Sequence, residues 1–331
     1  TTTGPIGIFD SGYGGLTILA KYAIAPHDNY LYLGDNARTP YGTRSFEVVY
    51  EFTLQAVRKL FGLAAPADIL LQHRFGKALR SIQQHDLPHL DPSRRVLGVI
   101  RPTVECIGAL THTRHVGLLA TEGTVRSQSY PLEIHKLYAD IRLTGVPCPM
   151  WVPLIENNEF NSPGADYFVQ KYLGQLLSQD PEIDTIILGC THYPLLLEKI
   201  RRYTPSHIRL VEQGKNVASS LKDYLARHPE LRTRCETGGT CQFLTTESIE
   251  KFQESASIFP ASGSASTHRY LRIETFFLLG NPYPQRGEAF PALGNRAHAV
   301  SVETMWHNKM HNFNAALQYN MALLENLKIG S

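Results

Sequence analysis

Short aliphatic or β-branched runs alternate with amphipathic segments of helical length along most of this chain, and this alternation limits its possible folds more than any other feature. Strands separated by single helices usually run parallel, because each crossover helix returns the chain to the same end of the sheet. The pattern therefore predicts an α/β fold with mostly parallel sheets flanked by helices. The expected strands are Pro5–Phe9, Tyr30–Leu33, Asp68–Leu71, Val96–Val99, His115–Ala120, Pro149–Val152, Thr185–Leu188 and His207–Val211.

The order of these runs predicts two similar halves. An Asp-Ser-Gly turn closes the first strand, and a Thr-Glu-Gly-Thr turn closes the strand that ends at Ala120. We expect residues 1–98 with about 213–258 to form the first domain and residues 99–212 to form the second. From about Pro260 the alternation gives way to Ser, His, Asn and aromatic residues, so residues 260–331 remain an unassigned tail with a helix-like stretch at Asn312–Leu327.

Charge and cysteine usage exclude several classes of protein. The net charge is +2 and the acidic and basic residues are scattered, so we expect no nucleic-acid or anionic membrane partner. No apolar run reaches the ~18 residues of a membrane span, and the N-terminus lacks a basic, apolar leader, which predicts a cytoplasmic protein. The five cysteines are odd in number and widely spaced, so neither a disulfide framework nor a metal site is expected.

Four turns that follow expected strands are rich in chemically active residues. Ligands of parallel sheets bind where the strands end, so these turns are the places to look for a site. The turns are Asp10-Ser11-Gly12-Tyr13-Gly14-Gly15, Gly34-Asp35 with Pro40-Tyr41-Gly42, Ala120-Thr121-Glu122-Gly123-Thr124, and Gly189-Cys190-Thr191-His192.

The first turn does not fit a phosphate cradle. It lacks the G-x-G-x-x-G spacing, and the carboxylate of Asp10 would repel a phosphate. Asp10 and Ser11 suit an ammonium group or proton transfer instead. The alternative is structural, because either residue can cap the helix that follows.

The fourth turn presents a thiol and an imidazole two residues apart. If a helix opens directly after Cys190, its N-terminal field favours the thiolate, and His192 can add positive charge or carry a proton. Cys190 is then a candidate base or nucleophile. The alternative is a small buried cysteine next to a surface histidine. Glu156, at an expected strand end after Trp151-Val152-Pro153-Leu154-Ile155, is a candidate to orient His192 or to tune Cys190, and otherwise an ordinary solvated glutamate.

Taken together, these motifs resemble the glutamate racemases of the aspartate/glutamate racemase superfamily. The resemblance covers about residues 4–258 in order. It rests on Gly7-Ile8-Phe9-Asp10-Ser11-Gly12-Tyr13-Gly14-Gly15-Leu16-Thr17, Gly34-Asp35, Pro40-Tyr41-Gly42, Ala120-Thr121-Glu122-Gly123-Thr124-Val125, Val152-Pro153-Leu154-Ile155-Glu156 and Leu188-Gly189-Cys190-Thr191-His192-Tyr193-Pro194.

This resemblance implies two pseudo-symmetric domains with the active site in the cleft between them, and a reaction that needs no cofactor and no metal. Inverting Cα without an electron sink requires one group to remove the proton and another to supply one on the opposite face. Cys190 would be one of two such thiols, with Asp10 and His192 assisting proton movement and Glu156 supporting His192. The implied glutamate contacts are Asp10, Ser11, Tyr41, Gly42, Thr121, Thr124, Thr191 and His192. The family also makes a homodimer an expectation.

The chain departs from the family at the other thiol. There the family motif reads Ala-Cys-Asn-Thr-Ala-Ser, whereas this chain reads Leu71-Gln72-His73-Arg74-Phe75-Gly76 and has no cysteine. The codons TGC AAC ACC GCT TCG GCA would encode the family's Cys-Asn-Thr-Ala-Ser-Ala, and the same bases regrouped as CAA CAC CGC TTC GGC encode Gln-His-Arg-Phe-Gly. We therefore hypothesise a local frame displacement that ends at Lys77. A similar displacement within Thr267–Arg272 predicts a poorly packed tail.

Without the first thiol, we expect little or no racemase activity. Two alternatives stay open. The superfamily includes decarboxylases that use a single cysteine, with which Cys190 is compatible, although the Asp10-Ser11 and Thr191-His192 motifs match amino-acid racemases. The second alternative is a non-catalytic binding role, since some racemases of this family interact with DNA gyrase. The sequence does not distinguish glutamate from aspartate.

Overall fold

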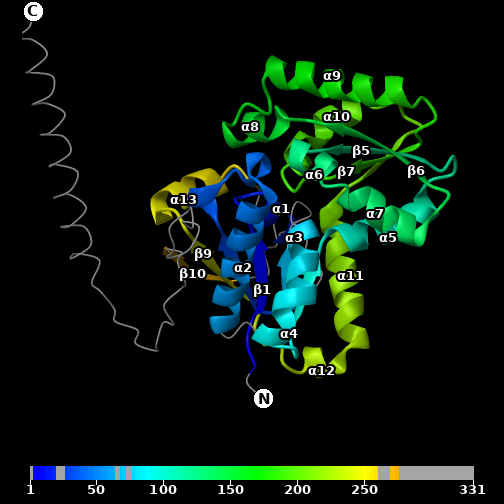
Figure 1. Ribbon diagram of the computed structural model, residues 1–331. Helices are drawn as coiled ribbons and strands as arrows, with labels where there is room; N and C mark the ends of the chain where they lie inside the picture. The colour runs from blue at the N-terminus through cyan, green and yellow to red at the C-terminus, as the bar shows by residue number, and fades with distance from the viewer. Residues whose placement is uncertain (1–2, 20–26, 64–67, 72–75, 260–268, 276–331) are drawn as a thin grey trace, which may run out of the picture. The chain divides into compact units, whose positions relative to one another are not determined.

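The computed structural model describes residues 3–19, 27–63, 68–71, 76–259 and 269–275. All of them belong to one compact unit, Thr1–Leu279. Their strands form two sheets in which every pair runs parallel, so the predicted α/β class is confirmed. Figure 1 shows both sheets flanked by helices.

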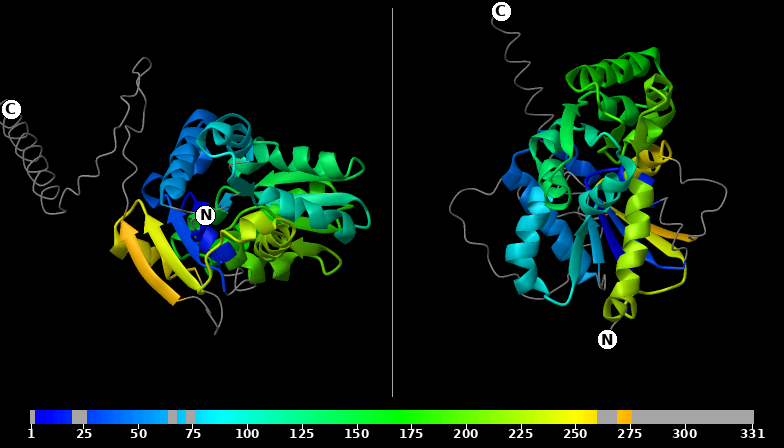
Figure 2. Two further views of the ribbon diagram at one scale, coloured as in Figure 1. Left: turned by 90° about the horizontal axis from the view of Figure 1, so that it is seen from below. Right: turned by 90° about the vertical axis from the view of Figure 1, so that its right-hand side faces the viewer.

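The first sheet is built from both ends of the described chain. Its strands have the order β10-β9-β2-β1-β3-β4. In Figure 2, β9 and β10 lie side by side at one edge, in yellow and orange. The strands are β1 (Ile6–Asp10), β2 (Tyr30–Gly34), β3 (Asp68–Leu71), β4 (Arg95–Gly98), β9 (Thr240–Thr245) and β10 (Arg269–Thr275).

The second sheet uses the middle of the chain, in the order β6-β5-β7-β8. Its strands are β5 (His115–Ala120), β6 (Arg142–Pro147), β7 (Thr185–Leu188) and β8 (Arg209–Val211). The domain boundaries expected from the sequence stay a prediction, and so does the poor packing of the tail.

Helices cover both sheets, and serine or threonine side chains cap several of them. Ser45, Thr121, Ser162 and Ser248 each accept a backbone N–H of the first turn that follows. The helices are α1 (Gly15–Leu19), α2 (Phe46–Gly62), α3 (Gly76–Ser81), α4 (Leu87–Leu90), α5 (Ile100–Leu110), α6 (Glu122–Arg126), α7 (Ser129–Leu137), α8 (Trp151–Glu156), α9 (Pro163–Gln179), α10 (Leu197–Tyr203), α11 (Gln213–Arg227), α12 (Pro229–Arg232) and α13 (Ile249–Ala256).

Strand periodicity sorts the core into separate clusters. In β2, Tyr30 and Tyr32 join one buried cluster, whereas Leu31 and Leu33 join the cluster under α2 on the opposite face. Both faces of β2 are therefore buried, as is typical of a parallel sheet covered by helices on both sides. The sheet is thus a rigid base for the turns that follow its strands.

Two expectations about elements are wrong. Residues Pro149–Val152 do not form a strand: the strand is β6, which ends at Pro147, and α8 starts at Trp151. Trp151 and Ile155 are both buried, four residues apart on one helix face, so the apolar run has a helical period. The expectation that the strand–helix alternation stops after residue 260 is wrong for Arg269–Thr275, which forms β10. Asn312–Leu327 lies outside the described residues.

Candidate active site

The turn after β1 holds a buried carboxyl group. Asp10 is fully buried, and its Oδ1 accepts the backbone N–H of Gly12 at 2.7 Å. Its Oδ2 has no hydrogen-bond partner among the residues that the structure describes. Burial raises the pKa of Asp10 to about 6, although the charge of His192 and the amide of Gly12 oppose the rise. Near neutral pH this carboxyl group therefore gains and loses a proton readily.

The turn after β7 holds the thiol and the imidazole. Cys190 is 5% exposed, and its Sγ lies 3.8 Å from Nδ1 of His192. The expectation that a helix opens directly after Cys190 is wrong: the next element is a single 3-10 turn, Tyr193–Leu196, and α10 begins only at Leu197. The partner of the thiol is thus the imidazole rather than the end of a long helix.

Glu156 completes a chain of three side chains. Oε1 of Glu156 lies 3.0 Å from Nε2 of His192. Glu156 is the last residue of α8, not the end of a strand as expected. Burial alone would lower the pKa of His192, but hydrogen bonds to Cys190 and Glu156 outweigh it and raise that pKa to about 10. At neutral pH the imidazolium therefore donates one N–H to Cys190 and the other to Glu156.

A glycine brings the turns after β1 and β7 into contact. A Cβ atom on Gly14 would overlap the hydroxyl of Thr191 and the ring of His192. The close approach is open to glycine because it has no side chain. Asp10 and the Cys190–His192 pair, which come from different sheets, are consequently held at one place. Charge at His192 also acts on Asp10, which links the protonation of the two groups.

The remaining expected contacts are divided among four turns. Ser11 is 8% exposed and Thr191 is 2% exposed, and Oγ1 of Thr191 has no hydrogen-bond partner within the described ranges. Thr121 caps α6, and its hydroxyl lies 2.8 Å from that of Thr124. Gly42 meets the second half closely, since a Cβ on Gly123 would lie 3.0 Å from the Gly42 carbonyl oxygen.

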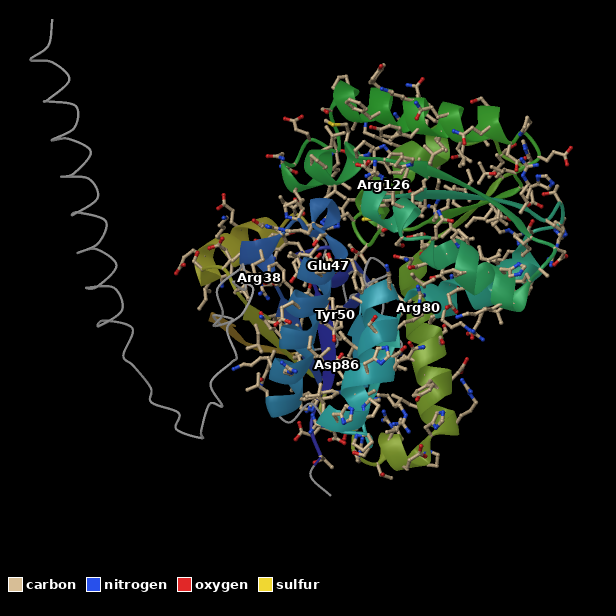
Figure 3. All side chains as sticks on the ribbon, in the orientation of Figure 1. Arg38, Glu47, Tyr50, Arg80, Asp86 and Arg126 are labelled. Carbon is tan, nitrogen blue, oxygen red and sulfur yellow. The ribbon has the colours of Figure 1, made fainter. Side chains whose placement is uncertain are left out.

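Tyr41 is placed differently from a simple substrate contact. Its ring is buried, and its hydroxyl donates to Oδ2 of Asp35. The same carboxylate accepts Nε of Arg38 at 2.6 Å and the hydroxyl of Thr246 at 2.8 Å. Arg38, labelled in Figure 3, also stacks its guanidinium 3.8 Å from the ring centre of Phe52. The Tyr41 hydroxyl therefore belongs to a buried polar cluster.

Sequence reasoning overlooked one residue beside the site. The ring of Phe259 meets the ring of His192 edge to face, with 5.4 Å between their centres. Phe259 is 3% exposed and shields one side of the imidazole. No sequence signal separates it from an ordinary core aromatic that follows an amphipathic helix.

Residues 72–75, where the sequence predicts the replacement of the family's first thiol, lie outside the described residues, so that expectation stays a prediction. Among those that the structure describes, no group of three or more His, Cys, Asp or Glu side chains is arranged to hold a metal ion. Within the same ranges no helix has both the length and the apolarity needed to cross a bilayer.

Comparison of the sequence finds racemases. Residues 16–218 match the family model described as Asp/Glu/Hydantoin racemase. A glutamate racemase from Enterococcus faecalis is 36% identical over 264 residues, which cover 76% of this chain and 90% of that protein. A glutamate racemase from Oceanobacillus iheyensis is 34% identical over 263 residues, covering 78% of this chain and 92% of the other.

Comparison of the structure gives the same group. A glutamate racemase from Bacillus anthracis matches with a TM-score of 0.73 and 26% identity, covering 83% of this chain and 98% of that one. The glutamate racemase from Francisella tularensis, solved in complex with D-glutamate, matches with a TM-score of 0.70 and 29% identity, covering 83% and 97%.

Proposed function

The chain belongs to the Asp/Glu/Hydantoin racemase family, and within it to the glutamate racemases, and we propose that it retains one half of a two-base site for glutamate. The observation that carries this proposal is the chain Cys190–His192–Glu156, buried at Cys190 and His192, which meets the Asp10 turn across Gly14. Buried groups with shifted pKa values at the ends of parallel strands are typical of catalytic sites.

The chemistry assigned to Cys190 is reversible proton transfer at one face of Cα. The thiolate breaks the Cα–H bond and becomes a thiol, while the electron pair is delocalised into the adjacent carboxylate. His192 and Asp10 assist this proton movement, and Glu156 keeps the imidazole oriented. A second group on the opposite face would complete inversion. In the family that group is the thiol of the motif replaced here by residues 72–76.

The substrate contacts are proposed from the turns around the thiol. Ser11 and Thr191 offer hydroxyl groups, and Thr121 and Thr124 lie in the turn after β5. The hydroxyl of Tyr41 donates to Asp35, so the substrate contact that we propose for Tyr41 and Gly42 is through their backbone.

A deuterium exchange experiment tests this half-site. In D2O, Cys190 removes Cα–H, the thiol exchanges its proton with solvent through His192, and Cα–D forms on the same face. We expect one enantiomer of glutamate to gain deuterium without net racemisation. Cys190→Ala should abolish this exchange, whereas Cys106→Ala, on α5, should leave it unchanged.

A variant with the first motif restored provides the positive control. Gln72→Cys, His73→Asn, Arg74→Thr and Phe75→Ala together should give net formation of D-glutamate from L-glutamate. Full racemase turnover by the unchanged chain would refute the expectation that its activity is impaired. Exchange missing from both chains, with no glutamate binding by calorimetry, would refute the racemase assignment.

A one-thiol decarboxylase is the second candidate, because Cys190 has no cysteine partner in the first-half motif. A single thiol can protonate one face of an enolate left by loss of CO2. Aryl-malonate decarboxylation, assayed beside glutamate exchange, separates the two. Release of CO2 without glutamate exchange would favour the decarboxylase.

In the cell we propose that this lineage supplies D-glutamate for bacterial peptidoglycan, acts in the cytoplasm and works as a homodimer. Growth of a D-glutamate auxotroph is the test of the pathway role. We expect rescue by the restored variant and not by the unchanged chain. Sedimentation velocity gives the oligomeric state, and a monomer at all concentrations would contradict the dimer.

A further inference from the structure

Thr17 lies in α1, directly after the Asp10 turn, and contacts the thiol turn of the other sheet. Its Oγ1 lies 2.6 Å from the carbonyl oxygen of Thr191 and 2.9 Å from that of Gly14. The Gly14 carbonyl already accepts the backbone N–H of Thr17 at 3.0 Å. The single hydroxyl proton is therefore best used by the Thr191 carbonyl, which also has the shorter distance.

Thr17 holds the peptide bond that links Thr191, the residue after Cys190, to His192. The Thr191 carbonyl belongs to the bond joining Thr191 to His192, so its orientation sets the direction in which the imidazole leaves the chain. Thr17 and Thr191 are 6% and 2% exposed, so water does not readily replace this hydrogen bond. Loss of the hydroxyl would leave a buried carbonyl oxygen without this donor.

Other contacts limit how His192 can respond. Gly14 lies against its ring, Glu156 binds Nε2, and Phe259 covers another side. Because these contacts confine the ring, a rotation of the Thr191–His192 peptide changes the 3.8 Å distance between Nδ1 of His192 and Sγ of Cys190. The thiol–imidazole contact thus depends on a hydroxyl from the other half of the molecule.

We infer that Thr17 is a positioning residue, whose hydroxyl holds the Thr191–His192 peptide so that Cys190 and His192 stay in contact beside the Asp10 turn. The inference deepens the proposed function and rests on it for the role of Cys190. The geometry itself is open to measurements that need no turnover.

The variants are Thr17→Val, which removes the hydroxyl and keeps the shape, and Thr17→Ser, which keeps the hydroxyl. Thr53→Val is the matched control, because Thr53 is also buried and its hydroxyl donates to the Val49 carbonyl oxygen within α2. The readouts are the imidazole titration of His192 by NMR, assigned with His192→Gln, and the iodoacetamide alkylation rate of Cys190 relative to Cys106, followed by peptide mass spectrometry.

For Thr17→Val we expect the His192 titration to move down by about one pH unit and relative Cys190 alkylation at pH 7 to fall about tenfold. Thr17→Ser and Thr53→Val should match the unchanged protein. A folded Thr17→Val with unaltered titration and alkylation would overturn the inference, as would a Thr17→Ser variant that behaves like Thr17→Val.

Thr17→Ala, which also removes the hydroxyl, is measured in parallel. If neither Val nor Ala at position 17 folds while Thr53→Val does, the residue serves stability and the inference is overturned. If Thr17→Val produces the expected changes at His192 and Cys190 but the protein never exchanges glutamate, the racemase proposal is refuted and the positioning role stands.

Discussion

Nε2 of His192 and Oε1 of Glu156 lie 3.0 Å apart, so the last residue of α8 supports the ring that follows β7. The pair is buried on the histidine side, which makes it different from a surface ion pair. The proton affinity of His192 is accordingly set by Glu156 from α8 and by Cys190 from the turn after β7.

Glu156→Gln should weaken this pair. The pKa of His192 rises on folding from 6.5 to about 10, so its contribution to stability is fully present below about pH 6.5 and disappears as the pH rises through about 10. We expect the variant to lose roughly 1–2 kcal/mol of unfolding free energy at pH 6, and much less at pH 10.5. Urea denaturation at both pH values measures it.

A matched control exists at the surface. His228 and Glu230 also form a histidine–glutamate pair, at 3.1 Å, but their side chains are 36% and 62% exposed. Glu230→Gln should have little effect on unfolding free energy at either pH, because an exposed ion pair is screened by solvent. Equal losses in the two variants would show that the Glu156 contact is no stronger than a surface pair.

Asp10→Asn should stabilise the protein, although it removes a carboxyl group from the candidate active site. Burial raises the pKa of Asp10 to about 6, so the ionised carboxylate opposes folding, and this cost grows as the pH rises from about 4 through 6. At pH 8 we expect a gain on the order of 1–3 kcal/mol, and at pH 3.5 a gain near zero. Thermal unfolding at the two pH values decides; destabilisation at pH 8 would contradict the buried charge.

Gly14→Ala should disrupt the contact between the two turns, because the added Cβ overlaps Thr191 and His192. We expect a loss of at least about 1 kcal/mol in stability and an altered alkylation rate of Cys190. Gly174→Ala is the control, since Gly174 lies within α9 with no atom within 4 Å of the added Cβ. It should leave Cys190 unchanged and stabilise α9 by roughly 0.5–1 kcal/mol.

The coding DNA offers a prediction that needs no protein. If a frame displacement produced residues 72–76, the codons of residues 71–77 should regroup by one frame into Cys-Asn-Thr-Ala-Ser. Sequencing both strands of the gene reads them directly. Codons that cannot be regrouped in this way would exclude the displacement and make the replacement a set of ordinary substitutions.

Much of the fold follows from local patterns. The expected bounds of Asp68–Leu71, His115–Ala120 and Thr185–Leu188 agree with the structure, because each is a short apolar run next to a clear turn. The run around Trp151 was ambiguous, since a short apolar segment buries equally well as strand or helix. The sequence of β10 does not by itself predict a strand, because β10 forms only by pairing with β9 at the edge of the sheet.

The site was predictable to the level of its turns. The rule that ligands bind where parallel strands end selected Asp10 and Cys190 from sequence. The bond from Tyr41 to Asp35 is local but has no periodic signal to mark it, and the contact between Phe259 and His192 joins residues far apart in sequence. Such contacts are decided by packing, so a pattern of residue types does not reveal them.

The position of β9 has a consequence for synthesis on the ribosome. β2 pairs with β1 on one side and with β9 on the other, yet residues 240–245 emerge long after Tyr30–Gly34. Until then the nascent chain carries an unfinished sheet with a bare strand edge, which is the kind of surface that aggregates or recruits chaperones. Completion of the first sheet must wait until the whole of the second has been translated.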